Sequence, residues 1–272
     1  HGSFFREQAT KLQESGVKVT VAYNEIWPLT LMGKVKEKIG LSFKVEKGLR
    51  TYRYKNYNFI PKHPLMFNIF DKRMEKLYKE VVKKEGKVDV IHAQSSLWGG
   101  ISAAYIAKKY NIPLIITEHS SVKKGKYVRE SYYKRIIDSY KSADAIIAVG
   151  NGLKKEIEEL TSRKDIKVIG NLVDLSLFDI RDIKRESDEF IFFSVAFLEG
   201  EKGFDTLIKS FSKKFKNEKA RLVIGGDGSQ REWLEGIAKS EGIESQITFT
   251  GALSREEVAR WMNKCHAFVL PS

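Results

Sequence analysis

The chain has 272 residues, room for two domains of ordinary size, and 42% of the residues are hydrophobic, which supports a core in each. It has no apolar run of about 18 residues that would indicate a transmembrane helix, and its single cysteine, Cys265, excludes an internal disulfide and fits a reducing compartment. The formal charge of +13 favours an anionic partner, but without an RNA-binding aromatic signature, a basic region or a zinc-ligand cluster we expect neither nucleic acid nor a metal.

The chain opens on a glycine turn that leads into a helix. Gly2 begins the turn, and Phe5, Ala9 and Leu12 follow on one helical face. A strand is predicted over residues 17–23. Because a strand precedes such a turn in a βαβ unit, we expect the sequence to begin inside its first strand-to-helix turn.

Residues 26–68 differ in character from the rest of the chain. Leu31, Val35 and Ile39 fall on one helical face, with lysines dispersed between them, and a basic and aromatic stretch covers residues 50–64. Two interpretations stay open. The segment is either an edge strand and excursion with a solvated basic face, or an element that docks on an anionic membrane surface or an acceptor.

From residue 70 helices and strands alternate regularly. The pattern predicts helices over 71–84, 97–110, 127–141 and 152–160, and strands over 88–93, 113–119, 144–150 and 166–170. This alternation is typical of an α/β domain with a parallel, doubly wound sheet.

Residues 175–188 are polar and charged and are predicted to be a linker. After it, the pattern predicts strands over 190–196, 221–225, 247–250 and 267–270, and helices over 204–216, 230–241 and 254–264. We therefore predict two Rossmann-like domains with doubly wound parallel sheets, residues 1–174 and 189–272, the second of them truncated.

The stretch from Phe190 to Phe211 combines a buried strand, a turn with Gly200 and Gly203, and an amphipathic helix. Free backbone N–H groups point outward at the positive end of a helix. Lys202 lies in this turn, and a lysine there makes an anion site that suits phosphate. The alternative is that Lys202 is one more solvated lysine.

Ligands of open parallel sheets bind beyond the carboxyl ends of the strands, and two facing sheets would form a cleft there. Residues at the predicted strand ends are therefore the site candidates: Gly2, His92, Glu118, His119, Ser120, Asn151 and Asn171 in the first domain, and Lys202, Gly226 and Gly251 in the second. Gly226 belongs to a glycine turn, residues 225–228, in which the missing Cβ lets a ligand approach the backbone.

His119 is the catalytic candidate, because it could hydrogen-bond a substrate hydroxyl and hold it near a reacting centre. The alternative is a structural histidine that satisfies backbone groups. We expect His92 to pack or to orient a loop.

These segments together resemble a group 1 glycosyltransferase of family 4, which has the two-domain GT-B fold. The family's glycine loop and first helix resemble GSFFREQATKLQESGVKVTV, its histidine turn resembles TEHS, and its hinge segment resembles GNLVDLSLF. The landmarks of its second domain resemble SVAFLEGEKGFDTLIKSF, GGDG, ITFTGALS and HAFVLPS. The resemblance covers the whole sequence in order.

The resemblance implies a nucleotide-diphosphate sugar as donor, held mainly by the second domain, and transfer with retention, without a metal or other cofactor. Lys202 would neutralise the diphosphate, where leaving-group charge develops. Gly2 would let the first loop approach the diphosphate, and His119 would contact the donor sugar or acceptor near the anomeric centre. Gly251 and Leu253 lie where the family holds the nucleotide base through backbone groups.

Two departures from the family pattern stand out. The basic residue that the family places five positions before the lysine is Phe197 here. The family's paired glutamates, seven residues apart, are expected after Ser272, so we expect these 272 residues alone to be inactive.

The sequence thus predicts a cytoplasmic enzyme, peripheral on the inner face of the membrane, that transfers sugar to a saccharide or lipid-linked acceptor in cell-surface polysaccharide or glycolipid synthesis. Two alternatives share the fold. A non-catalytic nucleotide-sugar binder is favoured by Phe197, and a sugar-nucleotide 2-epimerase would bring several carboxylates and histidines into the cleft.

Overall fold

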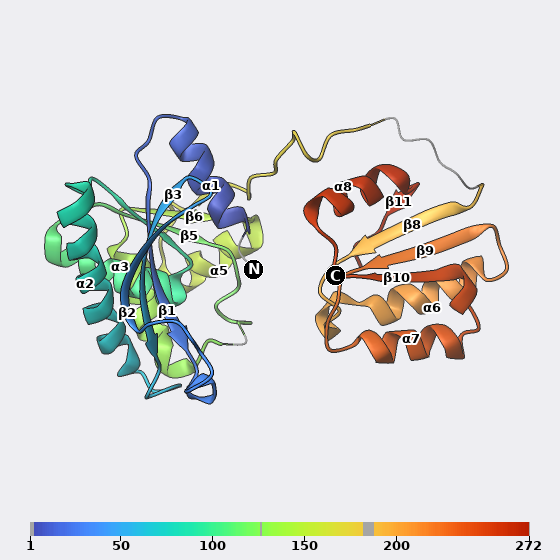
Figure 1. Cartoon of the computed structure of the whole chain (residues 1–272), viewed down its shortest axis with the longest axis horizontal. Helices are drawn as coiled ribbons and strands as arrows, with labels where there is room; N and C mark the ends of the chain where they lie inside the picture. Colours follow the sequence, from blue (N-terminus) through green and yellow to red (C-terminus); the bar gives the residue numbers. More distant parts are fainter. Residues whose placement is uncertain (1–2, 126, 182–187, 272) are drawn as a thin grey trace. The chain divides into compact units, whose positions relative to one another are not determined.

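The computed structural model describes residues 3–125, 127–181 and 188–271. The chain divides into two compact units, His1–Leu172 and Val173–Ser272, termed unit 1 and unit 2 (Figure 1). No helix among the described residues is long and apolar enough to cross a membrane.

Unit 1 begins with a helix, α1 (Ser3–Glu14), and a three-stranded sheet in the order β1-β3-β2. Its strands are β1 (Thr20–Trp27), β2 (Gly40–Glu46) and β3 (Leu49–Tyr57). Strand β3 runs parallel to β1 and antiparallel to β2. Helix α2 (Met66–Glu85) packs on this sheet and buries Leu77 and Val81 against Tyr52.

The prediction of a purely parallel sheet in the first half is wrong for β2. Only Lys47 and Gly48 connect β2 to β3, and both have positive φ, 49° and 83°. A two-residue turn of this kind joins antiparallel neighbours, because a parallel connection needs a long crossover. The helical face suggested by Leu31, Val35 and Ile39 is also not found: a single 3-10 turn, Leu29–Leu31, precedes β2. The edge-strand interpretation is therefore confirmed for residues 40–46.

The second sheet of unit 1 is parallel, in the order β4-β5-β6-β7. Its strands are β4 (Ile91–Gln94), β5 (Leu114–Glu118), β6 (Ala145–Ala148) and β7 (Lys167–Val168), and its helices are α3 (Ile101–Tyr110), α4 (Tyr133–Ser142) and α5 (Asn151–Thr161). Leu114, Ile116 and Ile146 of the strands and Ile136 of α4 form the centre of its core. This alternation confirms the predicted series.

Helix α3 begins later than predicted because the chain first makes a tight π-type turn, Ser96–Gly100. Ser95 and Trp98 have positive φ in this turn. A Cβ added to Gly99 would lie 2.9 Å from the carbonyl oxygen of Gln94. The turn therefore folds back on the end of β4 more closely than a side chain would allow.

Unit 2 is a parallel sheet in the order β10-β9-β8-β11 with helices on both faces. Its strands are β8 (Phe190–Val195), β9 (Ala220–Gly225), β10 (Ile247–Gly251) and β11 (Ala267–Phe268), and its helices are α6 (Phe204–Phe215), α7 (Arg231–Ser240) and α8 (Arg255–Lys264). Helices α6 and α7 cover the face that carries Leu222 and Ile224, whereas α8 covers the face that carries Phe193 and Val223. The predicted elements of this half are confirmed within three residues at each end.

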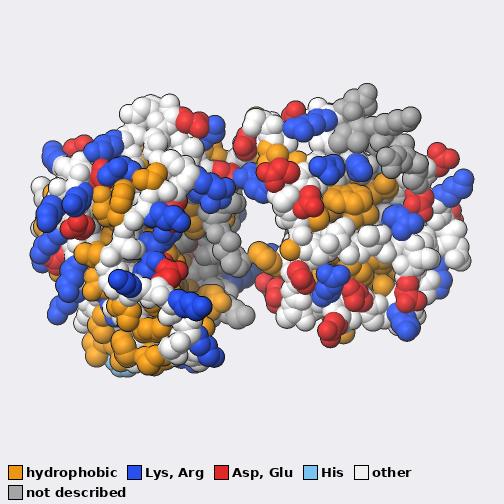
Figure 2. All heavy atoms as spheres, in the orientation of Figure 1, with side chains coloured by type: hydrophobic (Ala, Val, Ile, Leu, Met, Phe, Trp, Pro, Cys, Tyr) orange, Lys and Arg blue, Asp and Glu red, His pale blue; other side chains and the backbone are white. Residues whose placement is uncertain are grey.

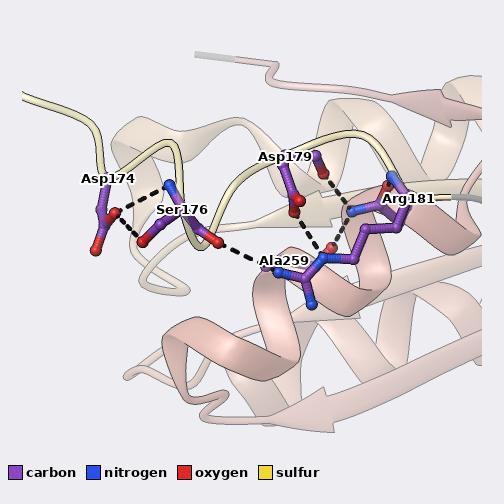
Figure 3. A network of polar contacts seen from close by, with 6 residues as sticks. Asp174, Ser176, Asp179, Arg181 and Ala259 are labelled. Atoms are coloured by element: carbon purple, nitrogen blue, oxygen red, sulfur yellow. Dashed lines mark hydrogen bonds and ion pairs between the residues drawn. The ribbon is translucent and has the colours of Figure 1, made fainter.

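Part of the predicted linker is attached to α8 in unit 2 (Figure 3). The backbone N–H of Arg181 donates to Asn263 Oδ1 at 2.7 Å, and Asn263 Nδ2 donates to the carbonyl oxygen of Asp179 at 3.0 Å. The Arg255 guanidinium lies 5.4 Å from the centre of the Phe178 ring. Residues 178–181 therefore pack on α8 within unit 2, while residues 182–187 lie outside the described residues.

A buried carboxylate holds the carboxyl end of β5 in place. Glu118 is 2% exposed, and its Oε2 accepts from Ser96 N (2.8 Å), Ser96 Oγ (2.7 Å) and the Tyr140 hydroxyl (2.6 Å). Its Oε1 accepts from the backbone N–H groups of His119 (3.0 Å) and Ser120 (3.3 Å). Burial and the neighbouring carboxylate raise the pKa of Tyr140, so the phenol keeps its proton and continues to donate. One side chain thus ties β5 to α4 and to the turn after β4.

We expect Tyr140→Phe to lower the free energy of unfolding of unit 1 by about 1–3 kcal/mol, because the buried Glu118 carboxylate loses a donor and gains no water in exchange. Urea unfolding followed by circular dichroism measures the change. Tyr127→Phe, at a tyrosine that is 71% exposed, is the matched control and should be neutral. Equal stability of the two variants would show that the Tyr140 hydroxyl does not stabilise unit 1.

Candidate active site

In unit 1 the candidate site centres on His119, directly after β5. Two aromatic rings of α1 pack on the imidazole, with centroid distances of 4.9 Å for Phe4 and 4.8 Å for Phe5. His119 Nε2 lies 2.8 Å from Gln94 Oε1, and Gln94 Nε2 donates to Gln8 Oε1 at 2.8 Å. Because an amide oxygen only accepts, Nε2 carries the proton of the neutral imidazole. The tautomer is therefore fixed by a relay of two glutamines.

The other ring nitrogen of His119, Nδ1, keeps a lone pair. It is buried and forms no hydrogen bond among the residues that the structure describes. Burial lowers the pKa of His119, and the Glu118 carboxylate and the Asn171 side chain oppose this shift more weakly. A neutral imidazole with a free acceptor can take a hydrogen bond from a hydroxyl group of a ligand.

A cavity of about 10 Å³, room for one water-sized group, lies beside the ring. Its lining comes from α1 and the carboxyl ends of β5, β6 and β7: Phe4, Gln8, Thr117, His119, Val149, Ile169, Gly170, Asn171 and Leu172. Of the predicted candidates in the first half, the structure thus brings His119 and Asn171 together.

The remaining described candidates of the first half do not line this cavity. Glu118 is buried and acts on the backbone of His119 and Ser120. His92 Nε2 bonds Thr117 Oγ1 at 2.7 Å, and burial lowers the pKa of His92. Asn151 is exposed at the first residue of α5. Gly2 lies outside the described residues.

Sequence reasoning missed the two glutamines that orient His119. Gln94 could have been found from the sequence, because it is a polar residue directly after the predicted strand 88–93. His119 was selected for the same reason, at the end of the next predicted strand, 113–119. Gln8 gave no signal, since it is one of several polar residues on the first helix. The contact between these two side chains joins positions that are 86 residues apart.

In unit 2 the candidate site is built from turns at the carboxyl ends of β8, β9 and β10. Gly226 has φ of +115°, and a Cβ added to it would lie 1.9 Å from the carbonyl oxygen of Ala196. A Cβ added to Gly228 would lie 2.5 Å from the carbonyl oxygen of Leu198. The 225–228 turn therefore packs on the loop after β8 at a distance that only glycine permits.

Lys202 lies on that same loop, at the end of a 3-10 turn that leads into α6 through Gly203, whose φ is 66°. Its ammonium forms no ion pair among the described residues. Glu199, three residues earlier, accepts from the Ser229 hydroxyl at 3.0 Å and so fastens this loop to the 225–228 turn. The lysine thus adds a positive charge beside the N–H groups at the start of α6.

Gly251 and Leu253 complete this cluster. The backbone N–H of Gly226 donates to the carbonyl oxygen of Gly251 at 2.7 Å. A Cβ added to Gly225 would lie 2.7 Å from Leu253 Cδ1, so the leucine packs on the end of β9. The structure therefore brings Gly226, Gly251 and Leu253 together, with Lys202 on the adjoining loop.

Sequence reasoning missed Arg231, the first residue of α7. A Cβ added to Gly251 would lie 3.4 Å from Nη1 of Arg231. The guanidinium of Arg231 therefore places a second positive charge, besides that of Lys202, beside this cluster. Arg231 also pairs with Glu235, one helical turn later, at 3.0 Å. A basic residue three positions after the GGDG turn was the available signal.

Two family models match the chain from end to end. The Glycosyltransferase Family 4 model matches residues 2–177, and the Glycosyl transferases group 1 model matches residues 177–272. The boundary between the two matches lies in the segment that precedes strand β8.

Curated relatives agree with this result. Alpha-monoglucosyldiacylglycerol synthase of Streptococcus pneumoniae is 24% identical over 212 residues, which are 70% of this chain and 48% of that protein. Glycogen synthase of Mycobacterium tuberculosis is 24% identical over 206 residues, 72% of this chain and 50% of that protein. The chain therefore spans about half the length of these curated relatives.

Solved structures share the fold. Sucrose-phosphate synthase from Thermosynechococcus elongatus superposes with a TM-score of 0.74 at 19% identity, over 99% of this chain and 69% of that one. HepE from Anabaena in complex with UDP-glucose gives a TM-score of 0.59 at 17% identity, over 80% and 60%. The predicted fold class, two Rossmann-like domains of the GT-B type, is confirmed, and the chain belongs to the group 1, family 4 glycosyltransferases.

Proposed function

We propose that this chain serves a glycosyltransferase that moves a sugar, with retention, from a nucleotide-diphosphate sugar to a saccharide or lipid-linked acceptor. The observation that carries the proposal is the position of Lys202 directly before the N-terminus of α6, on a loop that packs on the glycine turn 225–228. This combination offers an anion a positive charge, free N–H groups and a backbone that can be approached closely.

The transfer forms a bond between the anomeric carbon and the oxygen of an acceptor hydroxyl and breaks the bond between that carbon and the diphosphate oxygen. The hydroxyl proton leaves with the diphosphate, on which negative charge develops. Lys202 and the N–H groups of α6 would stabilise that charge, with no bound metal required. Arg231 lies beside the same cluster and could replace the basic contact that Phe197 does not supply. The backbone at Gly251 and Leu253 would hold the nucleotide base.

In unit 1, His119 would accept a hydrogen bond from a hydroxyl group of the donor sugar or the acceptor through Nδ1. The glutamine relay supports this role, because it keeps Nε2 protonated and leaves Nδ1 as the acceptor. Asn171, which lines the same cavity, would contact the same ligand.

The comparisons favour a nucleotide sugar and a lipid-linked acceptor. HepE, which shares the fold, is solved with UDP-glucose, and the pneumococcal relative is named for a product that carries glucose on diacylglycerol. We extend the proposal to a role on the cytoplasmic side of the membrane, in polysaccharide or glycolipid synthesis.

Lys202→Ala should weaken nucleotide-sugar binding by about 1.5–3 kcal/mol, because it removes a charge-assisted contact to the diphosphate. Titration calorimetry with the tightest donor from a panel of nucleotide sugars measures the loss. Lys209→Ala, at an exposed lysine of α6, the helix that follows Lys202, is the control and should leave affinity unchanged. If the two variants bind donor equally well, Lys202 does not hold phosphate.

His119→Ala should lower turnover about 10²-fold while changing donor affinity little, because the ring positions a reacting hydroxyl and not the diphosphate. Steady-state kinetics of the full protein separates the two effects. Unchanged turnover would make His119 structural, and donor binding without any turnover in the unmodified full protein would favour a non-catalytic binder.

Gln94→Ala tests the relay independently of the ring. We expect an intermediate loss of turnover with donor affinity retained, because the imidazole loses the acceptor that fixes its tautomer. Gln13→Ala, at an exposed glutamine on the helix that carries Gln8, should have no effect. A Gln94 variant with full turnover would exclude the relay from the mechanism.

A further inference from the structure

The loops that follow β1 and β3 lie at the same end of unit 1, the lower end in Figure 1. Five exposed large apolar side chains of these loops are together termed the apolar tip: Leu29 (39%), Leu31 (38%), Met32 (53%), Phe59 (59%) and Leu65 (55%). Figure 2 shows apolar side chains gathered at this end of unit 1, next to lysine and arginine side chains.

The two loops are fixed to each other and to the sheet. The backbone N–H of Asn58 donates to the carbonyl oxygen of Trp27 at 3.0 Å, and the Tyr57 hydroxyl donates to the carbonyl oxygen of Leu31 at 3.3 Å. The Trp27 and Tyr57 rings are buried, with centroids 5.4 Å apart, and the exposed Phe59 ring packs edge-on to Tyr57 at a centroid distance of 6.5 Å. The buried Trp27 and Tyr57 side chains therefore hold the apolar tip in place on the sheet.

Positive charge surrounds the apolar tip. The two stretches that carry it, residues 28–39 and 58–65, contain four lysines, Lys34, Lys36, Lys38 and Lys62, and one acidic residue, Glu37. Glu37 is paired with Lys55 of β3. The four lysines are exposed and form no ion pair with any residue that the structure describes.

The combination of apolar and lysine side chains on this surface favours a membrane over a protein partner. The core of a protein–protein interface is apolar, but lysine is depleted at such interfaces. Apolar side chains surrounded by lysines instead match the boundary of an anionic bilayer, where the side chains enter the acyl region and the ammonium groups meet phosphate.

We propose that the apolar tip inserts into the surface of an anionic membrane leaflet while the surrounding lysines contact lipid phosphate groups. This membrane attachment is independent of sugar transfer, although it would hold the proposed transferase beside a lipid-linked acceptor.

The test is co-sedimentation with vesicles of phosphatidylglycerol and phosphatidylcholine, and with vesicles of phosphatidylcholine alone, without donor or acceptor. The protein should bind the anionic vesicles, and raising the salt from about 0.05 M to about 0.5 M should weaken binding at least tenfold. Binding to phosphatidylcholine alone should be at least tenfold weaker.

Two double variants separate the contributions. Leu31→Ser with Phe59→Ser should lower binding at least tenfold at both salt concentrations, whereas Lys34→Gln with Lys36→Gln should lower it mainly at low salt. Trp233→Ser, at a tryptophan of unit 2 that is 51% exposed, is the matched control and should bind like the unchanged protein. Thermal unfolding shows whether each variant is folded.

Three results would overturn the proposal: no binding to anionic vesicles, binding that the Leu31 and Phe59 substitutions leave unchanged, or tip-dependent dimers in sedimentation velocity. The last would assign the apolar tip to a second copy of the chain. No sugar is transferred in these assays. A negative result would therefore contradict the membrane proposal alone, and the proposed function is tested separately by the Lys202, His119 and Gln94 variants.

Discussion

The candidate site of unit 1 depends on one buried carboxylate. Glu118 has almost no exposed surface to offer a ligand, yet its two oxygens receive hydrogen bonds from a helix, from the turn after β4 and from the backbone of the next two residues. A buried charge of this kind is stable only when its hydrogen bonds are all made, so the local backbone has little freedom. The position of His119 is set by that constraint.

In unit 2 the turns of the candidate site are held together by close backbone packing at glycines, which have no side chain. Gly226 and Gly228 let two turns approach within distances that a Cβ would block, and the Gly226–Gly251 hydrogen bond adds a third turn to the cluster. Lys202, in the turn before α6, then supplies charge to a surface made mostly of backbone. One unit therefore orients a side chain, and the other exposes main-chain groups.

The elements of unit 2 could be predicted from the sequence because each strand is a short apolar run with glycine or charge at its ends. The hairpin of unit 1 could not, since its turn, Lys47-Gly48, lacks the asparagine or aspartate that usually precedes glycine there. The candidate site residues at the ends of the strands could also be predicted from the sequence. The relay that sets the tautomer of His119 was not, because it exists only once the first helix packs on the second sheet.

The edge strand β2 has a consequence for handling the protein. Its Leu41, Phe43 and Val45 are about half exposed, and one of its edges has no partner strand among the described residues. Such an edge is a template for pairing with another chain, and charged side chains such as Lys44 are what usually discourage it. Neutralising Lys44, by acetylation or by mutation, would remove that protection and favour pairing of the exposed edge with another chain.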